Sequence, residues 1–542
     1  MIEINTKEWK FVLFISCIIV IITSAPMIVG ILSAPEGKTF LGYQWINSAD
    51  TPVYYSWIEQ GKEGHFLFKS LYTSEDQVRY IFDPFWLGVG LFAKIFSLSA
   101  FISYQLIRIF LIPIFLAVAY MFISFFFLEE RKRKICFFLL AFSSGLGGLV
   151  SAVVTTGGLN MATPSMDLWA VETVTFYELY QSPHFLASLT LTILTFLLIL
   201  LAFKKQKIIL SFLAGLTALL LFQFHPFNVP IVWGIIGGYV ITEIIRRRTL
   251  KFSLVTHYLV LITVSSPAVA YHLWSLQIFE SRAQYALQNN LLTPPLYNFL
   301  FTYGFIGLLA CVGIIFSLRK SNLNNHRMFL ISWIFIQLII SKLPFINFQI
   351  KSLEGLHFAL VLMATYGLFH LKDCAEKNKL CKKYFLQNKI ALILVAIPLI
   401  SFSNLIIMLR DVDSYLMHDA NFFQSNQKIS AAKWLRSNSS PDSIILSTET
   451  NGNLIPSLAV RTVYLGHPIS TANSNIKREQ LKLFFEKYND KVRADFMKIN
   501  RISYLFYGPE EKEYKNFNPD TIDYIEKIYQ NEEVKIYAVN KN

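Results

Sequence analysis

Asp50 is the side chain of this sequence that is best placed for acid–base chemistry. It follows the first long apolar segment, residues 11–33, within the stretch 45–55. A carboxylate next to a membrane surface can accept a proton from an alcohol, so Asp50 is the first candidate for a general base. The alternative interpretation is structural. Asp is a common N-cap residue, and Thr51 followed by Pro52 is typical of a helix start.

Asp83 is the second candidate base. It stands directly before Pro84 and the apolar segment 85–98. Pro favours the first position of a helix, and Asp favours the position before it. The same pattern therefore predicts an N-cap for a helix over 85–98, and both roles remain open at this point.

Several basic and polar side chains near the ends of apolar segments are candidates for binding a phosphate or a sugar. Positive charges and hydrogen-bond donors stabilise the negative charge of a phosphate. The candidates are Arg108, His184, His225, Lys351, Glu354 and His357. Lys351, Glu354 and His357 are spaced by three residues, which predicts that they share one helical face. A salt-bridged helix start explains the same spacing.

Each of the remaining candidates also has a structural alternative. A charge inside an apolar segment costs roughly 2.5–3.5 kcal/mol on insertion scales, so Arg108 must face a cavity or a partner. The alternative to substrate contact is a structural ion pair or a side chain that extends to the membrane interface. His184 and His225 are next to Pro183 and Pro226 at segment ends, where histidines often satisfy backbone groups.

Other motifs give weaker signals. The loop 154–183 contains Glu172, Tyr177, Glu178 and Tyr180, which suit sugar binding, although tyrosines are also frequent at membrane interfaces. Asp411 and Asp413 form a D-x-D, which alone is a weak metal signal. The sequence contains no His/Cys zinc pattern and no G-x-S-x-G nucleophile motif. We therefore assign no metal ligands.

Composition predicts a membrane protein. Of 542 residues, 54% are hydrophobic and 16% are charged, whereas a soluble protein has about 25% charged residues. Apolar runs of about 18 or more residues recur along the chain, and runs of this length are typical of membrane helices. We predict about eleven spans, at 11–33, 102–128, 135–153, 184–203, 208–224, 228–245, 252–274, 296–318, 328–342, 356–371 and 388–409. The segment 85–98 is short and is expected to lie in the interface.

The Lys and Arg residues of the loops predict the orientation. With 85–98 in the interface, one set of loops carries nineteen basic residues and the opposite set carries seven. The more basic loops are cytoplasmic by the positive-inside rule. We therefore expect a cytoplasmic N-terminus and an exterior loop 34–101 and tail 410–542, in a plasma membrane. This pattern also explains the net charge of +13, so nucleic acid is not an expected partner.

The tail is expected to fold as a separate domain. Polarity rises after Leu409, and short apolar segments alternate with segments of helical spacing. Strands are predicted at 443–447, 460–465, 502–507 and 534–539, and helices at 427–437, 476–487 and 489–499. Alternation of this kind predicts a small α/β domain. The predicted domains are thus 1–409, which is transmembrane, and 410–542, which is exterior.

The arrangement of one span, a long exterior loop with an early acidic residue, a many-helix bundle and an exterior domain resembles the GT-C glycosyltransferases. The protein O-mannosyltransferase-like and lipid A sugar transferase-like families are similar in outline. Two positions depart from their pattern. Thr51 follows Asp50 where those families often have Glu, and Phe82, Asp83 and Pro84 stand where a His-Pro-Pro-like element is usual.

The resemblance implies an inverting transfer of a sugar from a polyprenyl-phosphate donor to an acceptor hydroxyl on the exterior face. Asp50 or Asp83 would be the base, and the acceptor would be a glycan, a lipid or a protein. A divalent metal is left open. The alternatives are a transporter or flippase for a lipid-linked glycan, and a non-enzymatic membrane protein with an exterior binding domain. Transporters usually show repeated halves, and no internal repeat is found in this sequence.

Overall fold

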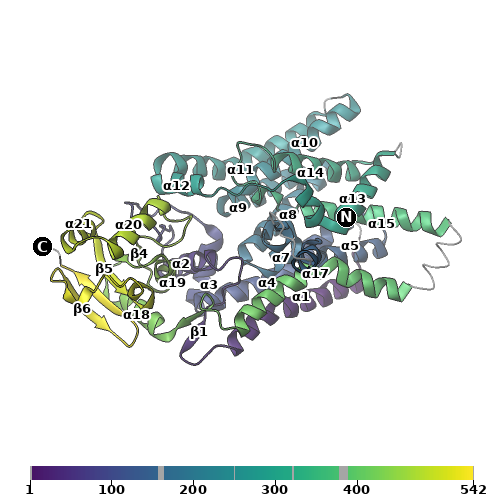
Figure 1. Cartoon of the computed structure of the whole chain (residues 1–542). Coiled ribbons are helices and arrows are strands. Elements are labelled where there is room, and N and C mark those ends of the chain that lie inside the picture. Colours follow the sequence, from purple (N-terminus) through teal and green to yellow (C-terminus); the bar gives the residue numbers. More distant parts are fainter. Residues whose placement is uncertain (1–2, 157–163, 250, 320–322, 378–388, 541–542) are drawn as a thin grey trace. The chain divides into compact units, whose positions relative to one another are not determined.

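The computed structural model describes residues 3–156, 164–249, 251–319, 323–377 and 389–540 (Figure 1). These residues form two compact units. Unit 1 consists of Met1–Pro26, Leu106–His272 and Leu291–Asp411. Unit 2 consists of Met27–Gln105, Leu273–Asn290 and Val412–Asn542.

Unit 1 is built from helices. Four of them, α1 (Thr6–Leu32), α4 (Ala100–Phe126), α11 (Phe252–Ile278) and α17 (Lys389–Leu416), continue into unit 2. The other α-helices are α5 (Glu130–Phe142), α6 (Gly147–Thr156), α7 (Thr175–Tyr180), α8 (Pro183–Lys205), α9 (Ile208–Phe224), α10 (Val229–Arg247), α13 (Leu296–Arg319), α14 (Asn325–Ile340) and α15 (Leu356–Lys377). Short 3-10 helices are η1 (Met166–Leu168), η2 (Val171–Thr173), η3 (Pro226–Asn228) and η4 (Lys351–Leu353).

Among the described residues, seven helices are long and apolar enough to cross a membrane. They are Thr6–Leu32, Ala100–Phe126, Pro183–Lys205, Pro226–Arg247, Phe252–Ile278, Leu296–Arg319 and Lys351–Lys377. Helices α9 and α14 coincide with predicted spans but have only 17 and 16 residues. Helix α17 coincides with the span predicted at 388–409, of which residue 388 lies outside the described residues. The multi-span architecture is therefore confirmed, and the count of eleven spans is not.

The span predicted at 135–153 is wrong, because the chain leaves the helix between α5 and α6. Ser144 N–H donates to Ile400 O at 2.6 Å and Leu146 N–H donates to Phe301 O at 2.7 Å, so other segments of unit 1 satisfy this backbone. Gly145 allows the close approach, since a Cβ atom there would lie 2.2 Å from Thr302 O.

The ambiguous segment 85–98 forms α3 (Pro84–Ile95), a helix of 12 residues. At a rise of about 1.5 Å per residue, this helix is roughly 18 Å long. The hydrocarbon core of a bilayer is about 30 Å thick, so α3 alone is too short to cross it. The length agrees with the interfacial placement, while the orientation of the chain remains a prediction.

Unit 2 combines the predicted exterior loop with the tail. Besides α3, it contains the helices α2 (Asp50–Glu63), α12 (Glu280–Gln288), α18 (Asn426–Asn438), α19 (Glu449–Ala459), α20 (Ser474–Glu486), α21 (Asp490–Ile499), α22 (Pro509–Lys512) and η5 (Pro519–Thr521). Its strands are β1 (Lys38–Phe40), β2 (Phe423–Ser425), β3 (Ile444–Leu446), β4 (Thr462–Val463), β5 (Ile502–Tyr507), β6 (Ile525–Gln530) and β7 (Lys535–Val539).

The tail contains a five-stranded mixed sheet in the order β4-β3-β5-β7-β6. Strand β3 is parallel to β4 and β5, and β7 is antiparallel to β5 and β6. All four predicted strands and all three predicted helices of the tail are present. Helix α19 was not predicted, because it contains Gly452 and Pro456, and such residues are poor helix formers. Strand β6 was not predicted either.

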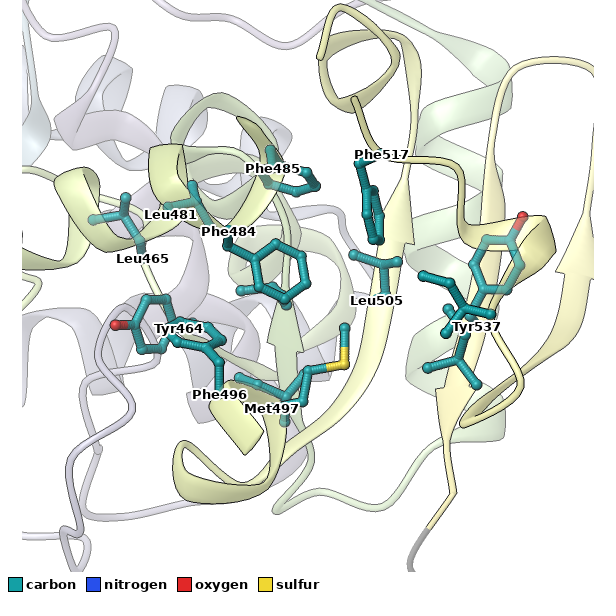
Figure 2. Packing of buried hydrophobic residues seen from close by; sticks show 14 residues of the cluster. Tyr464, Leu465, Leu481, Phe484, Phe485, Phe496, Met497, Leu505, Phe517 and Tyr537 are labelled. Carbon is teal, nitrogen blue, oxygen red and sulfur yellow. The ribbon is translucent and has the colours of Figure 1, made fainter. Parts of the chain in front are cut away.

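Both faces of this sheet are covered. Figure 2 shows Phe484 and Phe485 of α20 packed with Leu505 of β5, Phe517 and Tyr537. The neighbouring side chain on β5, Phe506, belongs to a second buried cluster on the other face, with residues of α18 and α19. Successive residues of a strand point to opposite faces, so β5 serves both clusters. The tail therefore has apolar cores made of its own residues.

The predicted exterior loop joins this tail within unit 2. Strand β1 of the loop pairs with β2 of the tail, and Thr73 forms a bridge with Leu465. Arg501 donates two hydrogen bonds to Asp76, at 2.7 and 2.6 Å. The compact unit is thus larger than residues 410–542, and the proposed domain boundary near 409 stays a prediction.

Candidate functional site

Asp50 is the first residue of α2, and its side chain does not cap that helix. The N-cap residue is Ala49, and Thr51 N–H donates to Asn47 O at 3.0 Å. The alternative prediction of an Asp50 N-cap is therefore wrong. A negative charge in the first turn of a helix is stabilised by the backbone N–H dipoles. The Asp50 carboxylate has this position while 42% of its side chain remains exposed.

His467 of the tail contacts Asp50. The distance between His467 Nε2 and Asp50 Oδ1 is 2.9 Å, and the imidazole is only 5% exposed. The other ring nitrogen, Nδ1, accepts backbone N–H groups from Ile469 at 3.2 Å and from Ser470 at 3.1 Å. No sequence pattern could pair His467 with Asp50, because 417 residues separate them.

Tight backbone packing fixes the segment that carries His467. A Cβ atom at Gly466 would lie 2.5 Å from Gly452 O and 2.9 Å from the ring of Tyr72. Thr471 links the two ends of this segment and joins them to Tyr72. Its hydroxyl accepts a hydrogen bond from Gly466 N–H at 3.1 Å and donates one to Tyr72 O at 2.6 Å. The imidazole therefore projects from a well-defined backbone.

Asp83 is an N-cap, as one of its two predicted roles required. Its carboxylate accepts a hydrogen bond from Trp86 N–H at 3.0 Å at the start of α3. Burial raises the pKa of Asp83 to about 7, and the backbone hydrogen bonds and the charge of Arg282 oppose that rise. Only 7% of the residue is exposed. Asp83 can hold a proton near neutral pH, but Asp50 is far more accessible.

In unit 1, Glu354 is at the centre of a buried polar cluster. Its Oε1 accepts hydrogen bonds from Ser188 Oγ at 2.6 Å and from Asn228 Nδ2 at 2.9 Å. His225 Nδ1 lies 3.4 Å from Glu354 Oε2 and 3.1 Å from Ser188 Oγ. All four residues are buried. Such a network holds the His225 ring in one orientation.

The prediction that Lys351, Glu354 and His357 share one helical face is wrong. Lys351 lies in η4, Glu354 has extended ψ, and α15 begins only at Leu356. Gly355, at φ +84°, turns the chain between the two helices. This value favours glycine, which has no Cβ atom. The regular spacing of the three residues therefore does not correspond to a continuous helix.

The three residues consequently have different neighbours. Lys351 Nζ lies 4.3 Å from the centre of the Phe227 ring. His357 Nδ1 is 3.0 Å from Thr175 Oγ1, and its Nε2 is 3.2 Å from Ser143 Oγ. Both ring nitrogens of the buried His357 thus have protein partners, which favours a structural role.

His184 and His225 come together, although their sequence positions gave no indication of this. Their ring centres are 5.9 Å apart, and His184 Nδ1 is 2.6 Å from Ser182 Oγ. The buried His225 Nε2 has no hydrogen-bond partner among the described residues. A buried polar atom of this kind usually has a water or ligand partner. This nitrogen could therefore contact a bound group.

Arg108 is buried in unit 1 and donates hydrogen bonds to three oxygen atoms there. Its guanidinium donates to Thr23 Oγ1 at 2.9 Å, to Ser24 Oγ at 3.3 Å and to Leu179 O at 3.4 Å. These contacts connect α4 with α1 and α7. They favour the structural alternative over contact with a substrate.

Asp167 is a buried acidic residue that the sequence did not indicate as part of a site. This buried carboxylate accepts from Ser165 Oγ at 2.5 Å and from Gly147 N–H at 3.1 Å. Burial raises its pKa to about 6, against the effect of these hydrogen bonds. A lone Asp in a loop gives no pattern from which Asp167 could have been found.

Glu178 is also buried, and burial, together with the charges of Glu354 and Glu172, raises its pKa well above the usual value.

The D-x-D motif does not form a paired site. Asp411 is buried and accepts from Tyr180 OH at 2.5 Å, whereas Asp413 is exposed two residues later on α17. Residues two apart on a helix point in different directions. Within the described part of the chain, no three His, Cys, Asp or Glu side chains are grouped to hold a metal ion. We therefore derive no step through a metal ion.

The predicted residues fall into two groups. Asp50 and Asp83 belong to unit 2, and the six predicted binding residues belong to unit 1. Of those six, the structure brings together His184, His225 and Glu354. Arg108 and His357 have separate surroundings.

Comparison with known proteins gives a result at the level of the fold. No protein-family model and no curated protein sequence matches the chain. The oligosaccharyltransferase of Archaeoglobus fulgidus, solved with a tethered acceptor peptide containing the NVT sequon, aligns with a TM-score of 0.53 and 13% identity. The alignment covers 92% of this chain and 69% of that chain.

A second solved structure is ArnT from Cupriavidus metallidurans bound to undecaprenyl phosphate. It aligns at 11% identity over 95% of this chain and 96% of that chain, with a TM-score of 0.46. That score is too low to establish a common fold, so the assignment rests on the archaeal enzyme. The chain therefore shares its fold with this oligosaccharyltransferase at 13% sequence identity.

Proposed function

We propose that the protein is an inverting glycosyltransferase. It transfers a sugar from a polyprenyl-phosphate donor to an acceptor hydroxyl on the exterior face of the plasma membrane. The observation that carries the proposal is the exposed Asp50 carboxylate, held at the start of α2 by a buried imidazole. The fold similarity to an oligosaccharyltransferase supports the reaction class.

Asp50 acts as the general base in this proposal. It accepts the proton of the acceptor hydroxyl while the hydroxyl oxygen forms a bond to C1 of the sugar. The bond between C1 and the phosphate oxygen breaks, and its electrons leave with the polyprenyl phosphate. Attack opposite to the leaving group inverts the configuration at C1. The proton is then released from Asp50 to solvent, which reaches this partly exposed side chain.

Donor binding is assigned to unit 1. His184, His225 and Lys351 are proposed to contact the phosphate or the sugar, and Glu354 holds His225 in place. The unpartnered His225 Nε2 supports this assignment. Because Arg108 and His357 are satisfied by protein groups, we propose that they support the helices around this cluster.

The test uses membranes that contain the protein and a set of labelled polyprenyl-phosphate sugars. The expected result is a labelled, covalently bound product with the anomeric configuration opposite to that of the donor. Product with the same configuration as the donor would contradict direct displacement. Donor that changes membrane side without any covalent product would instead support the flippase alternative. Addition of EDTA in parallel reactions determines whether transfer requires a divalent cation.

A further inference from the structure

His467 is a buried imidazole whose two nitrogens have different partners. Nδ1 lies within hydrogen-bond distance of two backbone N–H groups, those of Ile469 and Ser470. Both groups are donors, so Nδ1 must be an acceptor and carries no proton. The proton of the neutral ring is therefore on Nε2. Nε2–H then donates to Asp50 Oδ1 at 2.9 Å.

The two partners differ in their freedom to move. The His467 side chain is 5% exposed. Its ring is fixed by the two backbone donors and packs edge to face with the Tyr72 ring, whose centre is 6.3 Å from that of the imidazole. Asp50 is 42% exposed. A rigid donor bound to a partly exposed carboxylate restricts the rotation of that carboxylate. Catalytic groups gain rate when they are held in a productive orientation before the reaction.

The surroundings of this pair come from both parts of unit 2. Asn453 of α19 donates to Ala49 O at 3.1 Å, directly before Asp50. Tyr72 OH in turn donates to Asn453 O at 3.4 Å. The tail therefore fixes both the backbone before Asp50 and the side chain of Asp50 itself.

We infer that His467 is a positioning residue for the general base Asp50. Its Nε2–H orients the carboxylate and stabilises the ionised form that accepts the acceptor proton. The inference rests on the proposed function, and it assigns the tail a direct role in the reaction rate. His467 itself contacts neither donor nor acceptor in this account.

Two substitutions separate this role from a purely structural one. In His467→Gln, the side-chain amide nitrogen reaches the position of Nε2 and can still donate to Asp50, but the acceptor at Nδ1 is lost. In His467→Asn, the amide oxygen replaces Nδ1 and can still accept from the turn, but the donor to Asp50 is lost. The full-length protein in membranes is used for both variants.

Our inference predicts that His467→Asn lowers kcat by about ten- to hundredfold, as expected for loss of one hydrogen bond to a charged group. KM should change less than about twofold, because Nε2 does not contact substrate. His467→Gln should keep most of the wild-type kcat. Equal losses in both variants would show that His467 only supports the turn, and full activity of His467→Asn would also overturn the inference.

The outcome is distinguishable from failure of the proposed function. If Asp50→Asn abolishes transfer while His467→Asn is fully active, the base assignment stands and the positioning role is wrong. If no donor gives product, the contact is tested by thermal unfolding of Asp50→Ala, His467→Asn and the double variant. Non-additive shifts in melting temperature would support the hydrogen bond, and additive shifts would overturn it.

Discussion

The carboxylate of Glu354 accepts a hydrogen bond from the side-chain amide of Asn228 at 2.9 Å, inside unit 1. The same oxygen accepts from Ser188, so one buried carboxylate satisfies two buried donors. Removing this acceptor takes one hydrogen bond from each of the two donors, and each lost bond costs about 0.5–1.5 kcal/mol.

Glu354→Ala is therefore expected to lower the thermal stability of the purified protein strongly. Glu354→Gln retains one acceptor oxygen and should cost less. A matched control is Ser317→Ala, because the buried Ser317 hydroxyl only donates to Gly313 O in its own helix. Melting temperatures measured in detergent test the order. Equal melting temperatures for Glu354→Ala and Ser317→Ala would contradict the network.

Asp83 gives a prediction on pH dependence. Its pKa is raised from 3.8 to about 7 by burial, so the folded protein keeps this proton at pH values where the unfolded chain loses it. The stability contribution of Asp83 is full at low pH, declines as pH rises towards about 7 and is constant above that. Asp83→Asn keeps an N-cap side chain but does not titrate.

The measurement compares melting temperatures of wild type and Asp83→Asn from about pH 4 to pH 8. The difference should change in favour of the variant as pH rises to about 7, and then remain level. A difference that moves in favour of wild type with rising pH would show that the folded-state pKa is lowered instead.

Membrane orientation can be tested by cysteine labelling. Val78 and the exposed Ser437 both belong to unit 2, and the contact of Asp76 with Arg501 requires loop and tail to lie on the same side. In a background without the native cysteines, Val78→Cys and Ser437→Cys should react with an impermeant maleimide in intact cells. Gln206→Cys, in a predicted cytoplasmic loop, should react only after permeabilisation. The reverse pattern would invert the predicted topology and remove the proposed exterior reaction.

Replacement of one aromatic side chain in the tail core is expected to lower the stability of the tail strongly. Phe484 is completely buried among Phe485, Phe496 and Phe517. Its replacement by Ala should cost about 3–5 kcal/mol and open the tail to proteolysis. Ile499→Ala is the control, because Ile499 is 77% exposed. Cleavage of the tail at the same rate in both variants would contradict the packing in Figure 2.

The sequence predicted the apolar helices and the tail strands well, because both depend on local patterns. Residues 502–507 were expected to be a strand and form β5 with the same bounds. The break at residues 143–146 could not be predicted, since its backbone groups bond to Ile400 and Phe301, which are distant in sequence. Long-range contacts of this kind leave no periodic signal.

In the candidate site, too, features that depend on neighbouring residues were predicted, and features that depend on distant residues were not. Asp83 as an N-cap follows from its neighbour Pro84, and the structure confirms it. The shared face of Lys351, Glu354 and His357 failed because Gly355 ends the local helix. His467 and Asp167 were missed as site residues, because their partners come from remote segments or from backbone N–H groups.

The most direct test of the account is the rate of sugar transfer by Asp50→Asn under single-turnover conditions. The donor is one that the wild-type protein uses, and the control is Asp523→Asn, which changes an exposed carboxylate of the tail. Loss of a general base predicts a rate lower by about a hundred- to ten-thousandfold in Asp50→Asn at unchanged expression. Asp523→Asn should match wild type. Equal rates for Asp50→Asn and wild type would contradict the assignment of Asp50 as the base.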